Sequence, residues 1–387
     1  MKIAFLGYVF SGATLPLAKQ LYIKKCEVDC YYLVNRGSRS IESIDFNQQI
    51  KRLGKIQKIS TSNKIYQYMP KYVGIYVCPV LENRRSFVRF HLGGLCNSFN
   101  KFFLDHYVKL MIAQKYDVVN IIVQSKYELY IAQKLKEYGI KCVVSFHEVL
   151  DNLVGASVLK NIVLESLALN VPIIVHSKKT YDDLCCHFGQ DEMSGRIFLI
   201  HFGKFDSYLS FGNGKAIEDV KFPYYLYIGT LHPYKGIKYL CRAFHNMPIN
   251  SKLIIAGGGF DSCLNEVKDD KRFFIINRYI ENDEFVWLIK NCKAVICPYI
   301  AASQSGIVQT AFVFNKPLIA TKVGAFEEII VEGKNGFLAN PADSASLVEK
   351  ISLFEKSKMD RISFLSEKYD WSNIVMQYLN LFYTIVN

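Results

Sequence analysis

The stretch KAVICPYIAASQSGIVQTAFVFNKPLIAT, residues 293–321, decides the fold. It begins with the apolar run KAVICP and ends with KPLIAT, and the apolar segment IVQTAFVF between them is long enough for a helix. Two short apolar runs joined by a helix-length segment predict parallel strands with a crossover helix. The small polar segment AASQSG directly precedes this helix, and therefore lies at the carboxyl end of a strand, where sheets of this type bind ligands.

The same alternation runs through all 387 residues, too many for one core, so two domains are expected. The expected strands of the first half are KIAFLG, EVDCYYLV, YVGIYVCPV, YDVVNIIV, IKCVVSF, VPIIVHS and RIFLIHFG, and the second half adds YYLYIGT, KLIIAG and RFFII. We therefore predict an α/β protein with two Rossmann-like doubly wound domains that face each other across a cleft. The expected boundaries are residues 1–205 for the first domain, 206–223 for a linker, 224–365 for the second domain and 366–387 for a terminal helix that packs back toward the first domain.

Composition narrows the class of protein. Half of the residues are hydrophobic and 21% are charged, which excludes a disordered or fibrous chain. No apolar run approaches the ~18–20 residues that span a bilayer. The 11 cysteines are scattered without a C-x-x-C pair, which favours a reducing compartment, so we expect a cytoplasmic protein.

Positive charge is concentrated in residues 51–110, which hold 11 Lys and Arg against 2 Asp and Glu. Aromatic side chains are interleaved with these cations: Arg84, Arg85, Arg89, Lys101 and Lys109 lie among Phe87, Phe90, Phe99, Phe102, Phe103 and Tyr107. This pattern favours an anionic membrane surface on the inner face of the plasma membrane, or a phosphorylated acceptor. A solvated basic face and nucleic acid are the alternatives, although no nucleic-acid-binding module is recognisable.

Two strand ends have the residues that a diphosphate needs. In YIGTLHPYKGIKYLCRAF, residues 227–244, Lys235 opens a helix after a strand and a turn, which adds a cation to the free N–H groups of the helix. In AASQSG, Ser305 can donate its hydroxyl, and the small residues allow a charged ligand to approach the next helix closely. A surface lysine and an ordinary N-cap at Ser303 or Ser305 are the alternative interpretations.

In these and further motifs the chain resembles glycosyltransferase family 4, the retaining enzymes of GT-B fold. The matching segments are YIGTLHPYKGI, LIIAGGG, INRYIENDEF, residues 293–330 and GKNGFLANPAD, in the family's order between residues 227 and 343. The first half matches more loosely, through Gly7, Ser11 and Gly12 and the segments SFHEVL, VHSKKTYDDL and IHFGKFD.

The resemblance implies roles for single residues. Lys235 matches the family lysine that grips the donor diphosphate, while the family arginine of the preceding turn is here Thr230. The two family glutamates separated by seven residues are replaced by Ala302 and Thr310, and the variant sequence QSG offers Gln304 and Ser305 as substitute ligands. His147 resembles the histidine that contacts the transferring sugar, although a structural histidine is the alternative. The resemblance thus assigns catalytic roles to His147 and Lys235, and donor contacts to Gly12, Arg278, Gln304, Ser305, Gly306, Ile307, Thr310 and Glu328.

The implied activity is transfer of a sugar, with retention, from a nucleoside diphosphate sugar to a lipid-linked or growing saccharide in surface polysaccharide biosynthesis (capsule, O-antigen or exopolysaccharide). No cofactor and no metal ion are expected, since no Asp-x-Asp lies at a strand end. A nucleotide-sugar 2-epimerase of the same fold and a non-catalytic nucleotide-sugar-binding subunit remain alternatives. A dinucleotide oxidoreductase is disfavoured, because no G-x-G-x-x-G follows the first strand.

Overall fold

The computed structural model describes residues 1–8, 10–35, 38, 40–46, 53–81, 93–146, 156–189, 195–247 and 252–387. Contacts between residues divide the chain into two units, each described separately below. Unit 1 comprises residues 1–176, 180–203 and 370–387, and unit 2 comprises residues 177–179 and 204–369.

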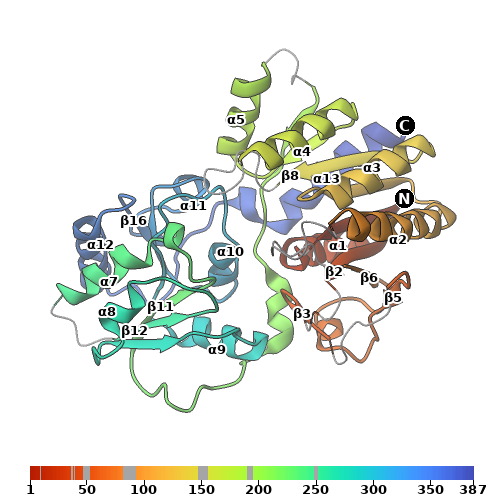
Figure 1. Ribbon diagram of the computed structural model, residues 1–387. Coiled ribbons are helices and arrows are strands. Elements are labelled where there is room, and N and C mark those ends of the chain that lie inside the picture. Colours follow the sequence, from red (N-terminus) through yellow and green to blue (C-terminus); the bar gives the residue numbers. More distant parts are fainter. Residues whose placement is uncertain are drawn as a thin grey trace. The chain divides into compact units, whose positions relative to one another are not determined.

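Unit 1 is built on an eight-stranded sheet whose order is β10-β9-β8-β7-β1-β2-β6-β5 (Figure 1). The strands are β1 (Lys2–Tyr8), β2 (Glu27–Asn35), β5 (Gln57–Lys58), β6 (Gly74–Val80), β7 (Val118–Ile122), β8 (Cys142–Phe146), β9 (Ile173–Val175) and β10 (Ile197–Leu199). All neighbours pair in parallel except β5, which runs antiparallel to β6 at the edge. The chain runs outward from β1 in both directions, which makes the sheet doubly wound.

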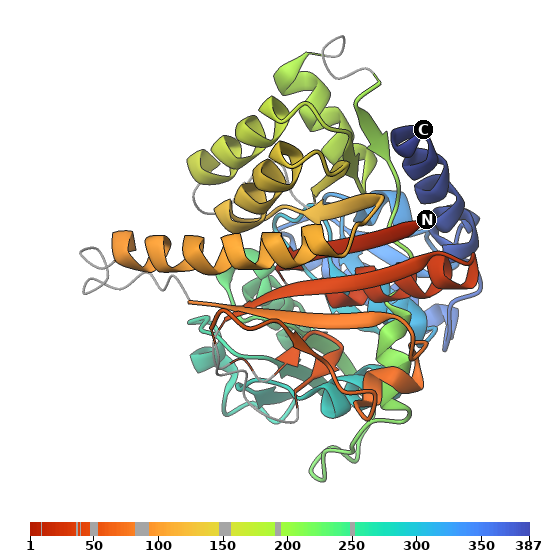
Figure 2. The ribbon, with the colours of Figure 1, turned by 90° about the vertical axis from the view of Figure 1, so that its right-hand side faces the viewer.

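Helices and short elements complete unit 1. They are α1 (Ser11–Ile23), the hairpin β3 (Ser40–Ile41) and β4 (Ile44–Asp45), η1 (Lys64–Gln67), α2 (Gly93–Ala113), α3 (Lys126–Glu137), α4 (Ala156–Ala168), α5 (Lys178–Phe188), whose first two residues belong to unit 2, and α13 (Trp371–Val386). Figure 2 shows α2 extending alongside the strands of unit 1. Apolar cores form on both faces of the sheet, as parallel strands require.

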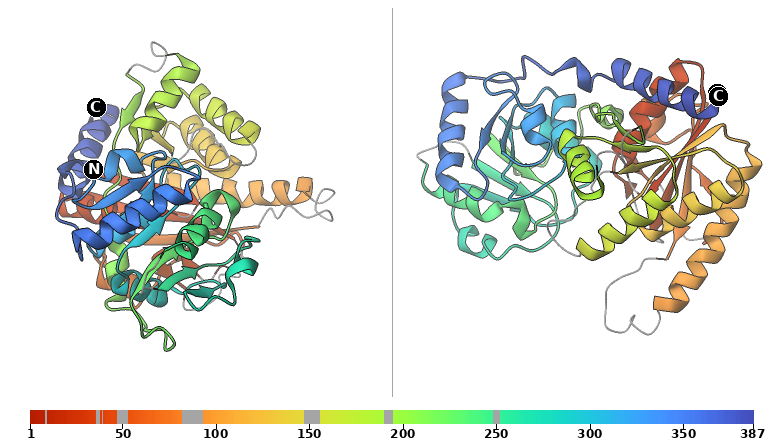
Figure 3. Two further views of the ribbon diagram at one scale, coloured as in Figure 1. Left: turned by 90° about the vertical axis from the view of Figure 1, so that its left-hand side faces the viewer. Right: turned by 90° about the horizontal axis from the view of Figure 1, so that it is seen from above.

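The terminal helix α13 packs in unit 1, beside α1, from the opposite end of the chain (Figure 3). Its apolar stripe is buried in the core that also holds β1 and α1: Trp371, Ile374, Val375, Tyr378, Leu379, Leu381 and Phe382. The helical spacing of these residues explains why one face of α13 docks on the sheet.

Helix α3 illustrates how the sequence sets a helix start. Ser125 accepts a hydrogen bond from the backbone N–H of Tyr127, and the Glu128 carboxylate accepts one from the N–H of Ser125 at 2.8 Å. This reciprocal arrangement is a capping box. Burial raises the pKa of Glu128 to about 7.

Unit 2 has a six-stranded, all-parallel sheet of order β13-β12-β11-β14-β15-β16. Its strands are β11 (Tyr224–Ile228), β12 (Lys252–Ala256), β13 (Phe273–Ile276), β14 (Val295–Cys297), β15 (Leu318–Thr321) and β16 (Gly336–Ala339). The helical elements are η3 (Asp206–Phe211), η4 (Pro233–Lys235), α7 (Ile237–His245), α8 (Leu264–Val267), α9 (Asn282–Asn291), α10 (Gly306–Val313), α11 (Phe326–Ile329), α12 (Ser344–Ser357) and η5 (Glu367–Tyr369). Two doubly wound α/β domains are therefore confirmed.

The boundaries of the units differ slightly from the expected ones. The chain enters the main part of unit 2 at residues 203–204, and the terminal segment of unit 1 begins at residue 370. The segment expected as a linker, residues 206–223, starts with η3, whose Tyr208 and Phe211 are buried and which contacts α9 and α10. Apolar side chains turn this part of the linker into a packed element of unit 2.

Candidate functional site

The strand order of unit 2 creates a switch point between β11 and β14. From β11 the chain proceeds outward to β12 and β13, and then returns to continue at β14 on the other side. Because the connections leave these two strands toward opposite sides, their carboxyl ends border the crevice in which such sheets bind ligands. The loops at this point are residues 229–236 after β11 and residues 298–305 after β14.

The two loops are in direct contact. Gly236 has φ 70°, and a Cβ atom there would lie 1.9 Å from the carbonyl oxygen of Pro298. The backbone N–H of Ile300 donates to the carbonyl of Tyr234 at 2.9 Å. Only glycine combines this backbone angle with such a close approach, so it fixes the position of Lys235 next to the β14 loop.

A third strand end joins them from β15. Gly324 has φ 52°, and a Cβ atom there would lie 2.1 Å from the carbonyl oxygen of Ala302. The N–H of Ala325 donates to the carbonyl of Ser303 at 2.9 Å. The segment AASQSG is thereby held from both sides.

Lys235 lies against aromatic rings at the switch point. Its Nζ atom is 3.8 Å from the ring centroid of Tyr299 and 4.9 Å from that of Tyr234. Burial raises the pKa of Cys297 to about 12, and the Lys235 ammonium acts in the opposite direction. The positive charge of Lys235 therefore lies close enough to the carboxyl end of β14 to act on the Cys297 thiol.

Tyr299 connects this lysine to the start of α10. Its hydroxyl lies 3.3 Å from the hydroxyl of Ser305, and the residue is only 1% exposed. Burial raises the pKa of Tyr299 well above its usual value, so the phenol keeps its proton. Ser305 is the N-cap residue of α10, yet its side chain accepts no hydrogen bond from the N–H groups of that helix. The N–H of Val308 donates to the backbone carbonyl of Ser305 at 3.2 Å, so the N–H groups of Gly306 and Ile307 are the first-turn donors left for another partner.

Two glutamine side chains near this helix start carry buried polar atoms without a partner. Among the residues that the structure describes, Gln304 Nε2 and Gln309 Oε1 are buried and make no hydrogen bond. A buried amide without a partner is costly and points to a missing ligand or water. Gln304 was expected from the sequence, whereas Gln309 and Tyr299 were missed. The place of Tyr299 two residues beyond a strand was the available signal.

The remaining predicted residues of α10, Gly306, Ile307 and Thr310, differ in the groups that they could present to a ligand. Thr310 is 1% exposed and its hydroxyl donates to the carbonyl of Gly306 at 2.7 Å, so its proton is used within the helix. Ile307 is half-buried in the first turn. A Cβ atom at Gly306 would lie 2.9 Å from the ring of Phe205, which shows how closely η3 approaches this turn.

Two predicted donor ligands are engaged in other contacts. The guanidinium of Arg278 pairs with both carboxylate oxygens of Glu284, at 2.6 and 2.8 Å. The carboxylate of Glu328 accepts hydrogen bonds from the backbone N–H groups of Lys178 and Lys179, at 3.1 and 3.2 Å. Both side chains would have to leave these partners to bind a ligand with the same atoms.

In unit 1, Gly12 lies in the first turn of α1 after β1. Its N–H donates to the Glu42 carboxylate at 2.5 Å. Glu42 comes from the turn of the β3–β4 hairpin, and no sequence pattern pointed to it. His147, the other expected residue of this half, lies outside the described residues.

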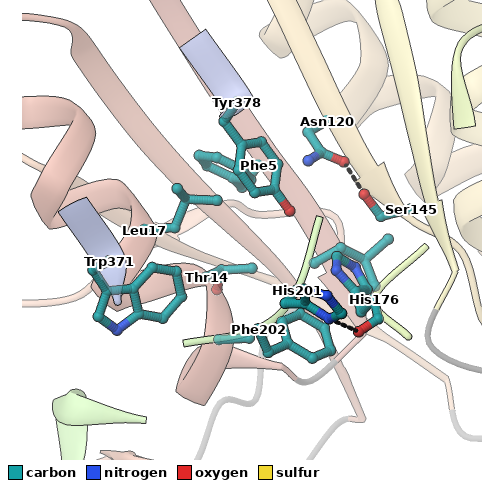
Figure 4. Close-up of a pocket in the computed structure, with 12 residues that line it drawn as sticks. Phe5, Thr14, Leu17, Asn120, Ser145, His176, His201, Phe202, Trp371 and Tyr378 are labelled. Carbon is teal, nitrogen blue, oxygen red and sulfur yellow. Dashed lines mark hydrogen bonds between the residues drawn. The ribbon is translucent and has the colours of Figure 1, made fainter. Parts of the chain in front are cut away.

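Unit 1 also contains a small cavity near the carboxyl ends of its strands (Figure 4). Its volume of about 10 Å³ suits one water molecule. In Figure 4 the Ser145 hydroxyl donates to Asn120 at 2.7 Å, and His201 Nδ1 lies 3.3 Å from the carbonyl oxygen of His176. His176 stacks on Phe202 with ring centroids 3.7 Å apart, and burial lowers its pKa to about 3. The cavity lies in the apolar core of unit 1, and a few polar groups stand among its mostly apolar lining.

Within the part of the chain that the structure describes, no helix is long and apolar enough to cross a membrane. Nor do the same residues contain a group of three or more His, Cys, Asp and Glu side chains that could hold a metal ion.

Comparison with known proteins supports this picture. Residues 222–355 match the family model Glycosyl transferases group 1. An uncharacterized glycosyltransferase of Methanocaldococcus jannaschii is 27% identical over 158 residues, which cover 39% of this chain and 45% of that protein. The chain thus spans less than half the length of the curated relatives it matches.

Solved structures are similar over almost the whole chain. The Anabaena protein HepE in complex with UDP-glucose has a TM-score of 0.66 at 16% identity, covering 99% of this chain and 100% of that one. Sucrose-phosphate synthase from Thermosynechococcus elongatus has a TM-score of 0.65 at 13% identity, covering 99% and 98%. Two doubly wound sheets of this kind define the GT-B class of fold. Residues 222–355, the part that matches the family Glycosyl transferases group 1, lie within unit 2 of this fold.

Proposed function

We propose that the chain is a glycosyltransferase that takes a sugar from a nucleoside diphosphate sugar bound in unit 2. One observation carries the proposal: Lys235 and the uncapped start of α10 meet at the switch point, where Tyr299 touches both. An ammonium group beside free helix N–H groups is a site for a diphosphate. The partnerless Nε2 of Gln304 adds a donor that an oxygen of the ligand would satisfy.

The proposed reaction retains the configuration of the sugar. The bond between the anomeric carbon and the diphosphate oxygen breaks, and the diphosphate leaves with both electrons. A bond forms between that carbon and an acceptor hydroxyl on the same face, and the hydroxyl proton passes to the leaving diphosphate. Lys235 and the start of α10 would stabilise the charge that grows on the diphosphate, an effect of roughly 3–4 kcal/mol per well-placed donor. His147, which directly follows β8, is proposed to contact the transferring sugar.

No metal ion is part of the proposal, because the lysine and the helix supply the positive charge. Transfer should therefore persist in excess chelator. The proposed acceptor is a lipid-linked or growing saccharide of surface polysaccharide biosynthesis, and the transferred group is a hexose. Product formation without any acceptor would instead favour a nucleotide-sugar epimerase, and binding without turnover would favour a non-catalytic subunit.

The donor is tested by thermal stabilisation with UDP-, GDP-, ADP- and TDP-sugars, because a bound ligand raises the apparent stability. Lys235→Ala should weaken binding of the best donor by about tenfold or more, the range for a lost hydrogen bond to a charged group. Lys238→Ala is the matched control, since Lys238 is exposed on α7 three residues further on. Equal affinities in the two variants would contradict the diphosphate site.

We further propose that the basic segment, residues 51–110, contacts an anionic membrane surface. Its described part includes α2, where Lys101 and Lys109 are exposed and Phe102 is 71% exposed. Exposed cations beside an exposed aromatic ring suit a lipid headgroup region. Arg84, Arg85, Arg89, Phe87 and Phe90 of this segment lie outside the described residues.

Sedimentation with vesicles that contain phosphatidylglycerol tests the membrane contact. Replacing Lys101 and Lys109 by Ser should weaken vesicle binding by about tenfold or more, since each cation contributes about 1 kcal/mol near an anionic leaflet. Replacing the exposed Lys238 and Lys268 of unit 2 by Ser removes the same charge elsewhere and should change binding little. If both pairs act alike, only the net charge matters and the assigned face is wrong.

A further inference from the structure

We propose that Tyr299 is a positioning residue of the donor site: its ring holds the Lys235 ammonium, and its hydroxyl keeps Ser305 from capping α10. This inference rests on the proposed function and adds a residue with its own testable role. The geometry that carries it is the pair of contacts at 3.8 Å to Lys235 Nζ and 3.3 Å to the Ser305 hydroxyl.

The ring is well suited to fix a flexible lysine. Tyr299 is 1% exposed, its carbonyl accepts a hydrogen bond from the Thr321 hydroxyl at 2.6 Å, and its ring centroid lies 5.5 Å from that of Phe326. An ammonium over a buried ring face is attracted by the ring and loses rotational freedom. Lys235 would therefore meet a diphosphate already oriented, so less entropy is lost when the ligand binds.

The hydroxyl acts at the other end of the site. A serine at an N-cap normally accepts a hydrogen bond from the second or third N–H of its helix. Ser305 makes no such bond to α10, and its hydroxyl instead lies next to that of Tyr299. The N–H of Val308 is bonded to the carbonyl of Ser305, so the pair leaves the N–H groups of Gly306 and Ile307 and the serine hydroxyl for a ligand.

The two roles can be separated by two substitutions. Tyr299→Phe keeps the ring and removes the hydroxyl, whereas Tyr299→Met fills a similar volume without an aromatic face. The probe is UDP, with GDP, ADP and TDP tried in parallel, and the readout is the dissociation constant by calorimetry. We expect Tyr299→Met to weaken binding roughly fivefold or more through the lost cation–ring contact. Tyr299→Phe should retain the contribution of Lys235.

A double-mutant cycle with Lys235→Ala distinguishes positioning from a general structural effect. If Tyr299 acts through Lys235, Tyr299→Met should change affinity less than about twofold when Lys235 is already alanine. An equal loss in both backgrounds would overturn the inference. A second cycle pairs Tyr299→Phe with Ser305→Ala, and additive effects there would overturn the role of the hydroxyl.

The control is Tyr225→Met, which removes another buried ring in the same sheet. Tyr225 lies under Lys293, with Nζ 5.4 Å from the ring centroid, and is not part of the β11 or β14 loops. This variant should leave UDP affinity unchanged. Should Tyr299→Met fail to fold, Tyr299→Leu replaces it in the same cycle. A wild-type protein that binds none of the four diphosphates would refute the proposed function itself, while binding that depends on Lys235 but not on Tyr299 would refute only this inference.

Discussion

The Glu42 carboxylate accepts a hydrogen bond from the backbone N–H of Gly12 at 2.5 Å, at the start of α1. Gly12 is the residue of unit 1 to which the resemblance assigned a donor contact. The Ser11 hydroxyl donates to the carbonyl of Ile41 at 2.9 Å, so the hairpin that carries Glu42 is tied to the helix at a second point. The N–H group of Gly12 is therefore already bonded to a carboxylate of the same chain.

Replacing Glu42 should separate its capping role from its charge. Burial raises the pKa of Glu42, so the native state favours the protonated carboxyl, and stability falls as pH rises from the unfolded to the folded pKa. Glu42→Gln keeps an acceptor for Gly12 without the charge, and should be at least as stable as the wild type at pH 8. Glu42→Ala removes the acceptor and should cost about 1 kcal/mol. Thermal unfolding at pH 8 measures both, and a glutamine variant as unstable as the alanine variant would contradict the argument.

The turn at Gly236 should tolerate no side chain. Gly236→Ala would place a methyl group 1.9 Å from the Pro298 carbonyl oxygen. Gly333 has a similar φ of 74° with open space around its Cβ position, so Gly333→Ala reports the backbone strain alone, about 1–2 kcal/mol. Gly236→Ala should cost a further ~1–3 kcal/mol from overpacking and should also weaken nucleotide binding, because it displaces Lys235. Equal unfolding midpoints for the two variants would show that the β11 and β14 loops are not tightly joined.

Arg278 should contribute little to donor affinity through its side chain. Its ion pair with Glu284 is partly exposed and engages both guanidinium nitrogens. Such pairs contribute about 0–1 kcal/mol to stability, so Arg278→Ala should have a small effect on unfolding. Its nucleotide affinity should remain within about twofold of the wild type, in contrast to Lys235→Ala. A tenfold loss in calorimetry would show that Arg278 leaves Glu284 to bind the ligand.

The sheets could be predicted because parallel strands that are covered on both faces read as continuous apolar runs. YYLYI of β11 is entirely buried, for example, and its role was clear from the sequence. The β3–β4 hairpin has two residues in each strand and gives no such pattern. Its carboxylate, Glu42, meets Gly12 only through the tertiary fold.

For the site, the positions of single residues could be predicted from the sequence, but their contacts could not. Lys235 and Ser305 could be selected because each follows a strand end, and all strand ends of a parallel sheet point the same way. Which side chains pair with each other could not be predicted, because pairing depends on rotamers and on the exact approach of two loops. Arg278 and Glu328 were selected as ligands on resemblance, and the structure shows their charged groups in contact with Glu284 and with the start of α5.

Two buried groups of unit 1 should give opposite pH dependences of stability. Burial lowers the pKa of His176 from 6.5 to about 3, so its contribution is present above pH 6.5 and is lost as pH falls. Burial raises the pKa of Glu128 from 4.5 to about 7, so its contribution is present at low pH and is lost as pH rises toward 7. Each group changes the free energy of unfolding by about 1.4 kcal/mol per pH unit between its unfolded and folded pKa values. The two changes have opposite sign and nearly cancel between pH 5 and 6.5.

Single substitutions should reveal the pH dependence of stability that each of the two groups contributes. His176→Asn retains a donor for the Ile200 carbonyl, which lies 2.7 Å from Nδ1 of the histidine. Of these two groups only Glu128 still titrates in this variant, so its unfolding midpoint should fall more steeply than that of the wild type as pH rises from 5 to 6.5. Glu128→Gln retains the cap of α3 and should show the opposite trend, because only His176 remains. Thermal unfolding across this pH range measures both, with the double variant as the baseline for the contribution of all other groups. Parallel profiles for His176→Asn and the wild type would show that His176 is not held neutral in the core, since its removal would then leave the proton balance of folding unchanged.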